Sequence, residues 1–169
     1  MLIREAAYAD VDEILRLYEQ AREYFRANGI PQWLDGKPDY DDVFGDIDDG
    51  ISYVAAENGR IAAVFACDFF EDMRYPSLLG GSWLNGDEYA GLHRVAVNSG
   101  LKRRGIGSEI VKFVLTRCFE NGVFNIRCDT HPKNAPMRGM LEKNGFCKCG
   151  RFYLANGEER VAYHLELNQ

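Results

Sequence analysis

Hydrophobic residues follow a helical period in the first part of the chain. Over residues 14–25 they recur every three or four positions, which is typical of a helix with one buried face. Asp10 and Glu13 stand three residues apart just before this pattern, in the spacing of a capping box. We therefore predict a short strand at residues 2–4 and a helix over residues 10–28.

A second helical pattern is shorter, and after it the period changes. The sequence predicts a short helix that begins near Tyr40. Residues 51–57 and 60–70 are rich in small and β-branched apolar residues and indicate two strands. Asn58 and Gly59 stand between them, and this dipeptide favours a type I′ hairpin turn.

The remaining pattern predicts a mixed fold. Residues 71–90 are irregular and too long for an ordinary connection, so we expect a loop that covers a functional face. After it we predict a strand at 91–97, a helix that ends before Gly122, a strand at 123–129, a helix from about Pro136 to Asn144, and a hairpin around Asn156-Gly157. The resulting fold class is mixed α/β (α+β): a mostly antiparallel sheet, one parallel β-α-β crossover, and helices on both faces.

Length and charge limit the possible functions. The 169 residues fit a single domain, 1–169. With 20 Lys and Arg against 26 Asp and Glu, the net charge is −6, which argues against nucleic acid as a partner of the whole surface. No apolar run is long enough to cross a membrane, so we expect a cytoplasmic protein that binds no membrane.

The five cysteines are odd in number and lie mostly in apolar segments, as expected of reduced, packed thiols. Cys147 and Cys149 are two residues apart, which places both on one face of a regular strand. Two such ligands without a second cluster do not define a zinc site, so we expect no metal.

Cations and glycines separate the strand at 91–97 from the next helix. The turn and the first helical residues are Lys102, Arg103, Arg104, Gly105, Ile106, Gly107 and Ser108. Glycines let the main chain approach a ligand, and the first turn of a helix offers N–H groups and a positive dipole end, so a pyrophosphate would fit. A solvated basic turn is the alternative. The pattern matches neither a Walker A loop nor a dinucleotide fingerprint.

With this turn and one further segment, the chain resembles the GNAT family of N-acetyltransferases over nearly its whole length. The family's loop (Arg or Gln, two residues, Gly, one residue, Gly or Ala) corresponds to Lys102–Gly107, with lysine in place of the usual first residue. The segment NAPMRGMLEKNGF resembles the part of the family that follows its fifth strand. Asn134, Gly145 and Phe146 are in the family's positions there.

The resemblance implies that acetyl-CoA is the co-substrate. In the family, the loop holds the coenzyme pyrophosphate through main-chain N–H groups, and the strand before it carries a bulge. By this resemblance Val95 and Val97 contribute main-chain contacts to pantetheine and to the thioester carbonyl, and Asn134 contacts the pantetheine arm. The implied activity is direct transfer of the acetyl group to a primary amine in a ternary complex.

Two histidines are candidates for the base. His93 resembles in position a histidine of the arylalkylamine branch of the family, and an imidazole can take a proton from an ammonium group, for example through water. On a regular strand it shares a face with Val95 and Val97. A structural histidine bonded to a carbonyl is the alternative. His131 could act instead, and we expect His164 to be structural.

The acid that protonates the leaving thiolate is not evident. Many members of the family have a tyrosine where this chain has Leu141, and leucine cannot donate a proton. Tyr153, Tyr163 or water could replace it. The alternative function is a non-catalytic module that binds acyl-CoA or regulates.

Acidic and aromatic residues mark the region where the family binds its acceptor. They are Asp35, Asp39, Asp41, Asp42, Asp46, Asp48 and Asp49 around Trp33 and Tyr40, and Glu71, Asp72, Asp87 and Glu88 around Trp83. Most are expected on solvated faces, but the others could attract a cationic amine. We therefore expect a small amine or a peptide N-terminus as acceptor. A homodimer is plausible through an edge formed by Val161, Tyr163 and Leu165.

Overall fold

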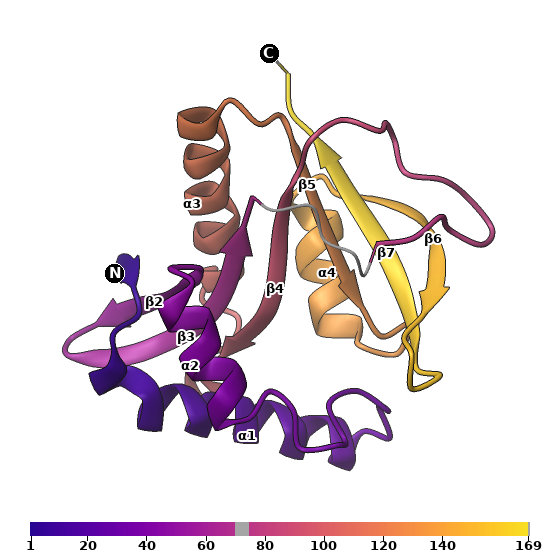
Figure 1. Cartoon of the computed structure of the whole chain (residues 1–169). Coiled ribbons are helices and arrows are strands. Elements are labelled where there is room, and N and C mark those ends of the chain that lie inside the picture. Colours follow the sequence, from indigo (N-terminus) through magenta and orange to yellow (C-terminus); the bar gives the residue numbers. More distant parts are fainter. Residues whose placement is uncertain (70–74, 169) are drawn as a thin grey trace. The chain divides into compact units, whose positions relative to one another are not determined.

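The computed structural model describes residues 1–69 and 75–168 (Figure 1). The chain divides into two compact units. The first contains Met1–Cys67 and His93–Phe113, and the second contains Asp68–Leu92 and the residues from Val114 onward. β4 (Ala90–Val97) and α3 (Ile106–Asn121) pass from one unit to the other. The single domain that the length predicts stays a prediction.

Within the described residues, seven strands form one sheet in the order β1-β2-β3-β4-β5-β7-β6. The other strands are β1 (Leu2–Glu5), β2 (Ser52–Glu57), β3 (Arg60–Asp68), β5 (Asn125–Thr130), β6 (Cys147–Tyr153) and β7 (Glu159–Glu166). β4 and β5 are parallel, whereas β1 with β2, β2 with β3, β5 with β7, and β6 with β7 are antiparallel. The mixed fold with one parallel crossover is therefore confirmed.

The first helix begins differently from the prediction. A 3-10 turn at Tyr8–Asp10 precedes α1 (Val11–Ala27), and the capping box of Asp10 and Glu13 does not form. Asp10 instead accepts a hydrogen bond from the Ala7 N–H at 2.8 Å. Glu13 accepts one from the main chain of β3, at 2.9 Å from the nitrogen of Ile61. The extra turn shifts Asp10 from the helix cap into the turn itself.

The second helix, α2 (Tyr40–Asp48), begins where the sequence predicts. Asp39 accepts a hydrogen bond from the Asp42 N–H at 3.0 Å, and the Asp42 carboxylate accepts one from the Asp39 N–H at 2.8 Å. This reciprocal capping satisfies main-chain donors that the first turn of a helix leaves without partners. Two of the acidic residues that precede or begin the helix thus have a structural role.

The hairpin of β2 and β3 confirms the expected turn. Asn58 has a φ of 52° and Gly59 a φ of 75°, the left-handed pair that a type I′ turn requires. Val54 and Val64, which are paired across the two strands, belong to an apolar cluster with buried residues of α1 and α2. One face of the hairpin is therefore covered by these two helices.

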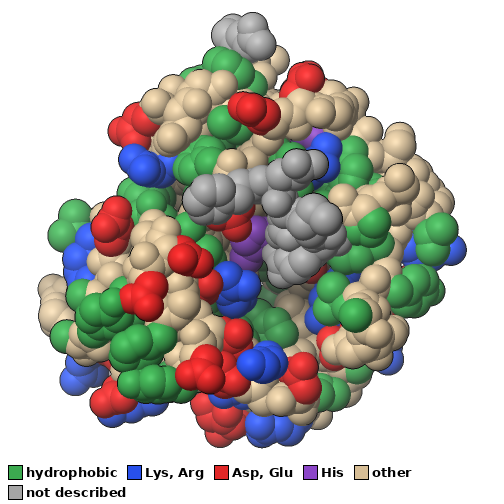
Figure 2. Space-filling model, in the orientation of Figure 1, with side chains coloured by type: hydrophobic (Ala, Val, Ile, Leu, Met, Phe, Trp, Pro, Cys, Tyr) green, Lys and Arg blue, Asp and Glu red, His purple; other side chains and the backbone are tan. Residues whose placement is uncertain are grey.

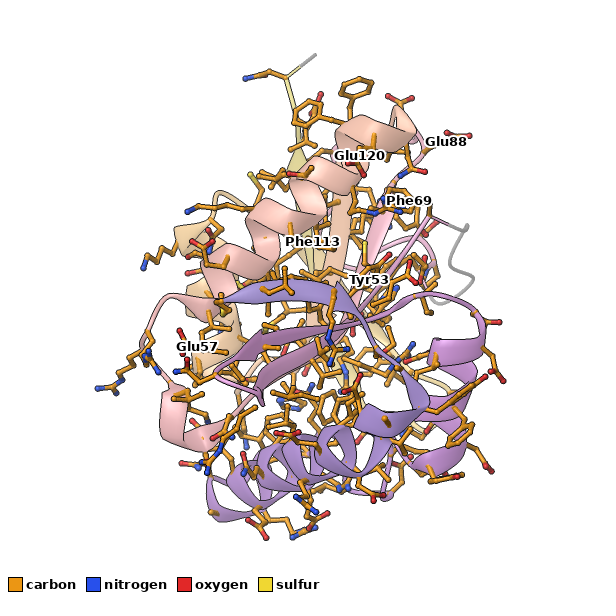
Figure 3. All side chains as sticks on the ribbon, turned by 90° about the vertical axis from the view of Figure 1, so that its left-hand side faces the viewer. Tyr53, Glu57, Phe69, Glu88, Phe113 and Glu120 are labelled. Carbon is orange, nitrogen blue, oxygen red and sulfur yellow. The ribbon has the colours of Figure 1, made fainter. Side chains whose placement is uncertain are left out.

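The opposite face of the same hairpin packs against the beginning of α3. The ring of Phe113 lies 5.0 Å from that of Tyr53 and 5.9 Å from that of Phe65, centre to centre. Figure 3 shows Phe113 and Tyr53 at this contact. In the first unit, helices thus cover both faces of the sheet, which explains why β2 and β3 are apolar almost without alternation.

The second unit contains α4 (Ala135–Lys143) and the hairpin of β6 and β7. The register between these strands shifts between Lys148 and Gly150, so β6 has a bulge there. Cys147 is consequently exposed while Cys149 is buried, and the prediction that both lie on one face is wrong. The connection between the strands spans residues 154–158, so the hairpin is confirmed with a loop longer than two residues.

The described part of the irregular segment, residues 75–89, lies on the sheet of the second unit. Leu79 and Arg151 of β6 exchange main-chain hydrogen bonds of 2.8 and 3.0 Å. A Cβ on Gly81 would lie 1.9 Å from the carbonyl oxygen of Cys149, so only glycine allows this approach. Glu71 and Asp72 lie outside the described residues.

β7 is an internal strand, because it is paired with β5 on one side and with β6 on the other. The prediction that Val161, Tyr163 and Leu165 form a free edge for dimerisation is therefore wrong, since the main chain of β7 already has partners on both sides. In the described part of the chain, no helix is both long and apolar enough to cross a membrane.

Candidate functional site

The turn between β4 and α3 is held by two side-chain contacts at its beginning. Asn98 accepts a hydrogen bond from the Gly100 N–H at 2.9 Å and so caps a short 3-10 turn, Ser99–Leu101. Gln20 of α1 accepts a hydrogen bond from the Ser99 N–H at 3.0 Å. These contacts fix the direction in which the chain enters the glycine-containing part of the turn.

The next part of the turn has two left-handed residues, Arg103 with a φ of 63° and Gly105 with a φ of 76°. No heavy atom lies within 4 Å of an ideal Cβ on Gly105, so the main-chain conformation is what requires glycine. α3 begins directly afterwards at Ile106 and runs for 16 residues. The N–H groups of its first turn have no acceptors within the helix and can bind an anion.

The three cations of the turn have different surroundings. The ammonium group of Lys102 lies 4.2 Å from the centre of the Tyr24 ring, and Arg104 forms an ion pair of 3.3 Å with Glu57. Arg103 is exposed and forms no ion pair with any described residue. Arg103 is therefore the cation of this turn that is available to an anionic ligand.

β4 is irregular where the sequence predicts main-chain contacts to a thioester. Arg94 has a φ of 49°, a left-handed conformation that an L-residue rarely adopts inside a strand. The half-buried Val95 and Val97 follow it. The expectation that His93 shares a face with these valines assumes regular alternation, which a left-handed residue interrupts.

The side chain and the main chain of Arg94 are both held by other elements. Its guanidinium donates two hydrogen bonds to the carboxylate of Asp46 on α2, at 2.8 and 2.7 Å. Its carbonyl oxygen accepts a hydrogen bond of 3.2 Å from the hydroxyl of Tyr18 on α1. Burial raises the pKa of Asp46 although Arg94 acts in the opposite direction, and burial also raises the pKa of Tyr18.

The candidate base His93 is buried next to this group. The residue is 5% exposed, and it directly precedes Arg94, the partner of Asp46, in β4. The sequence placed Asp46 among the acids of the acceptor region and assigned no role to Tyr18 or Arg94. The available signal was the charge of Arg94 within a mostly apolar strand, because a charge at such a position needs a partner.

Asn134 and His131 belong to the second unit. Asn134 accepts a hydrogen bond from the Met137 N–H at 3.3 Å, as the cap of α4, and donates one to Thr130 at 3.1 Å. His131 Nδ1 accepts a hydrogen bond from the Lys133 N–H at 3.0 Å, which leaves the proton of the neutral ring on Nε2. Burial lowers the pKa of His131, with a smaller effect of Arg160 in the same direction.

His164 has the surroundings of a structural histidine. Its Nδ1 accepts a hydrogen bond from the Leu84 N–H at 3.2 Å, and its Nε2 lies 2.9 Å from the side-chain oxygen of Asn125. This network requires a neutral ring with the proton on Nε2. Burial lowers its pKa to about 4, assisted by the charge of Arg127.

The two tyrosines that could replace the missing general acid have different surroundings. Leu141, which stands in the family's tyrosine position, is fully buried. The hydroxyl of Tyr163 donates to Glu142 at 2.8 Å and accepts from Arg138 at 3.1 Å, and burial raises its pKa. Tyr153 is exposed at the end of β6.

Several acidic and aromatic residues of the predicted acceptor region have partners within the protein. Asp48 accepts a hydrogen bond from the hydroxyl of Tyr8. Trp33 packs edge-on against Tyr18 and Phe25, and the ring of Trp83 lies 4.3 Å from the guanidinium carbon of Arg127. Acidic and basic side chains are interspersed over the face shown in Figure 2. Asp48 and both tryptophans of the predicted acceptor region thus have contacts within the protein.

Comparison with known proteins agrees with this fold and this turn. The model of the Acetyltransferase (GNAT) family matches residues 14–146. A GNAT-family acetyltransferase from Streptococcus agalactiae is 30% identical, with a TM-score of 0.87 over 99% of this chain and 96% of that chain. The chain therefore belongs to the GNAT family of acetyltransferases, and the resemblance noted from the sequence is confirmed.

Two more distant structures share the fold. A ribosomal-protein-alanine N-acetyltransferase from Brucella melitensis is 19% identical, with a TM-score of 0.71 over 99% of this chain and all of that chain. YncA from Salmonella typhimurium, solved with its cofactor acetyl-CoA, is 17% identical, with a TM-score of 0.70 over 99% of this chain and 94% of that chain. The search of curated protein sequences found no match.

Proposed function

We propose that this acetyltransferase transfers the acetyl group of acetyl-CoA to the nitrogen of a primary amine by direct attack in a ternary complex. The observation that carries this proposal is the turn before α3, with its left-handed Arg103 and Gly105 leading directly into the first turn of the helix. Main-chain N–H groups, a helix dipole and one available cation are what a pyrophosphate needs. Family membership supports the choice of acetyl-CoA as donor.

Each residue of the turn is proposed to have one of three roles toward the coenzyme. In the proposal, the main chain from Gly105 to Ser108 and the side chain of Arg103 bind the pyrophosphate. Lys102 and Arg104 add positive potential, although each also has a partner within the protein. Ile106 is buried and fixes the first turn of α3 against the core.

The donor supplies an activated acetyl group as a thioester, and the protein orients it and moves protons. The main chain of Val95 and Val97 is proposed to hold the pantetheine arm and to polarise the thioester carbonyl, which stabilises the developing oxyanion. Asn134 is proposed to contact pantetheine as well, as the family resemblance implies. The half-buried position of both valines after the irregular Arg94 supports this role.

The attacking amine must lose a proton. We propose His93 as the base, acting through water because its side chain is buried. His131 is the second candidate, and its Nδ1 already accepts a main-chain hydrogen bond. Water is proposed to protonate the leaving thiolate, because a thiol with a pKa near ~8.5 is a good leaving group without a dedicated acid.

The acceptor is proposed to be a small cationic amine or a peptide N-terminus. Attraction of a cation now depends on fewer carboxylates than the sequence suggests, since Asp39, Asp42 and Asp46 are used within the protein. Asp41 and Asp49 are exposed at the two ends of α2 and can still contribute. Thiol release from acetyl-CoA with a panel of cationic, neutral and anionic amines tests this class.

Calorimetric titration with acetyl-CoA tests the donor site, with Arg103→Glu as the variant and Arg26→Glu, an exposed arginine of α1, as the control. We expect Arg103→Glu to weaken binding at least ~10-fold, because a charged hydrogen bond contributes about 1.5–3 kcal/mol. The control should bind as the wild type does. Equal affinity of both variants would contradict the proposed role of the turn.

The titration and the thiol-release assay together separate an enzyme from a module that only binds acetyl-CoA. Thiol release in the presence of an amine of the panel supports the enzyme. Acetyl-CoA binding without turnover of any amine would favour the non-catalytic alternative, which the buried Leu141 in place of a tyrosine keeps in consideration.

A further inference from the structure

The irregular residue of β4 is unusual in its type. Glycine, asparagine and aspartate are the residues that most often adopt a left-handed conformation, yet in β4 it occurs at Arg94, with a φ of 49°. Such a conformation persists only where the surrounding structure holds it, and such strain often occurs at functional sites. The residues that hold Arg94 in this conformation are therefore candidates for a functional role.

Two restraints act on this residue from two different helices. Tyr18 of α1, which is 2% exposed, donates its hydroxyl hydrogen bond to the carbonyl oxygen of Arg94 at 3.2 Å. Asp46 of α2 binds the guanidinium of Arg94 through two hydrogen bonds. The first fixes the peptide that leads into Val95, and the second fixes the side chain on the same Cα.

We propose that Tyr18 and Asp46 are positioning residues for acetyl transfer, because together they hold the left-handed conformation of Arg94. This inference rests on the proposed function. The groups proposed to polarise the thioester are main-chain groups of Val95 and Val97, and rotation at Arg94 would turn the peptides that follow it. A displacement of about 1 Å at reacting groups can reduce a rate about 100-fold.

The chain contains a matched control for the ion pair in the same unit. Arg4 also binds one aspartate, Asp10, through two hydrogen bonds, of 2.7 and 3.0 Å. Both carboxylate side chains are similarly covered, at 12% exposed for Asp10 and 13% for Asp46. Asp10 lies at the start of α1 and has no contact with β4 among its hydrogen bonds and ion pairs with described residues.

The experiment compares Asp46→Asn, Tyr18→Phe and the control Asp10→Asn. Thiol release from acetyl-CoA is measured with the panel amine that the wild type acetylates fastest, together with the thermal unfolding midpoint. We expect kcat to fall ~10- to ~100-fold for the first two variants. The KM for acetyl-CoA should rise by a smaller factor than kcat falls, because the pantetheine contacts of Val95 and Val97 are disturbed while the turn proposed to bind pyrophosphate is intact. The control should keep the kcat of the wild type.

Arg94→Gly extends the test to a variant that relieves the strain. Glycine adopts the left-handed conformation freely but has no side chain for Asp46 to hold. We expect this variant to fold and to have a reduced kcat, with a KM for acetyl-CoA that changes by a smaller factor. Arg94→Lys, which keeps the charge but loses the paired hydrogen bonds, should fall between Arg94→Gly and the wild type.

Failure of this inference differs from failure of the proposed function. An active wild type with an unchanged kcat in Asp46→Asn, Tyr18→Phe and Arg94→Gly overturns the positioning role and leaves the acetyltransferase assignment intact. A kcat reduced equally in Asp10→Asn also overturns it, because the effect would then be general destabilisation. If the wild type binds acetyl-CoA but acetylates no amine, the proposed function fails and this inference with it.

Discussion

The start of α1 and the middle of β4 contain the same ion pair in two different environments. In each, one arginine donates two hydrogen bonds to one aspartate, Arg4 to Asp10 and Arg94 to Asp46. Hydrogen bonding from Arg4 lowers the pKa of Asp10, whereas burial raises the pKa of Asp46. Arg4 is 41% exposed and Arg94 is 25% exposed, so the second pair has less water to solvate it.

This difference shows that hydrogen-bond geometry does not determine what an ion pair contributes. A lowered aspartate pKa means that the folded protein favours the ionised carboxylate, so the Asp10 pair stabilises the fold. A raised pKa means that desolvation exceeds the attraction of Arg94, so ionised Asp46 costs stability. The pair of Arg94 and Asp46 costs stability and holds a left-handed residue, and a functional role would explain both features.

The largest expected effect comes from removing the arginines. Arg94→Met leaves the Asp46 carboxylate covered and without its partner, which should cost about 3 kcal/mol of unfolding free energy at pH 7. Arg4→Met should cost about 1 kcal/mol, since Asp10 keeps its hydrogen bond from the Ala7 N–H and lies in a more exposed pair. Urea unfolding measures both values. Equal costs would mean that the two environments do not differ in the way described.

A third arginine, Arg127, sharpens the comparison, because it forms no ion pair with a carboxylate of the described residues. Arg127 is buried between the rings of Trp83 and Tyr89, 4.3 and 4.2 Å from their centres, and donates to the carbonyl oxygen of Asn85 at 2.9 Å. Burial lowers its pKa. Arg127→Met should therefore cost only about 1–2 kcal/mol in urea unfolding, less than Arg94→Met. A larger loss would show that the aromatic contacts contribute more than an ion pair.

The pH dependence of stability should differ in sign between the two aspartates. The contribution of Asp10 is present above its unfolded pKa of 3.8 and is lost as the pH falls through its lowered folded pKa. Ionisation of Asp46 instead removes stability as the pH rises from 3.8 through its raised folded pKa. The unfolding free energies of Asp10→Asn and Asp46→Asn, each subtracted from that of the wild type between pH 2 and 6, should have opposite slopes against pH.

This subtraction also removes the effect of His164. Its pKa of about 4 is below the ordinary value of 6.5, so the unfolded chain takes up a proton that the folded chain resists. Stability due to His164 is therefore lost as the pH falls from 6.5 towards 4, in the wild type and in both variants. Slopes of the same sign in the two difference curves would contradict the assigned pKa directions.

The smallest expected effect is that of salt. Raising NaCl from 0.1 to about 1 M shortens the screening length from about 10 to about 3 Å, which weakens an exposed pair more than a covered one. In double-mutant cycles, the coupling of Arg4 with Asp10 should fall by a few tenths of a kcal/mol. The coupling of Arg94 with Asp46 should change less. An equal decrease in both would indicate that water reaches the two pairs alike.

Most elements of the fold could be predicted from local patterns. The hairpin turn at Asn58-Gly59, the beginning of α2 near Tyr40, and the crossover from β4 through α3 to β5 are all confirmed. They depend on residues close together in the sequence, or on connection lengths that allow few topologies. Where a single residue changed the register, as with the extra turn before α1 or the bulge after Lys148, the prediction from regular periodicity was wrong.

The candidate site was predictable in part. The turn at residues 102–107 is recognisable because its cations and glycines are contiguous. The restraints on Arg94 come from Tyr18 and Asp46, which are 76 and 48 residues away, so no local pattern contains them. The roles of His93 and His131 stay predictions, since both depend on where an amine binds.

The sequence by itself determined most helices and strands and the position of the glycine-containing turn before α3, because each follows from spacing or from the chemistry of neighbouring residues, and its motifs were enough to recognise the family. Only the tertiary structure decided which charges are used within the protein. Asp10 and Asp46 are the same residue type in similarly acidic segments, yet their pKa values shift in opposite directions. The physical reason is burial: the cost of removing a charge from water depends on the protein packed around it, and residues far away in the sequence supply that protein.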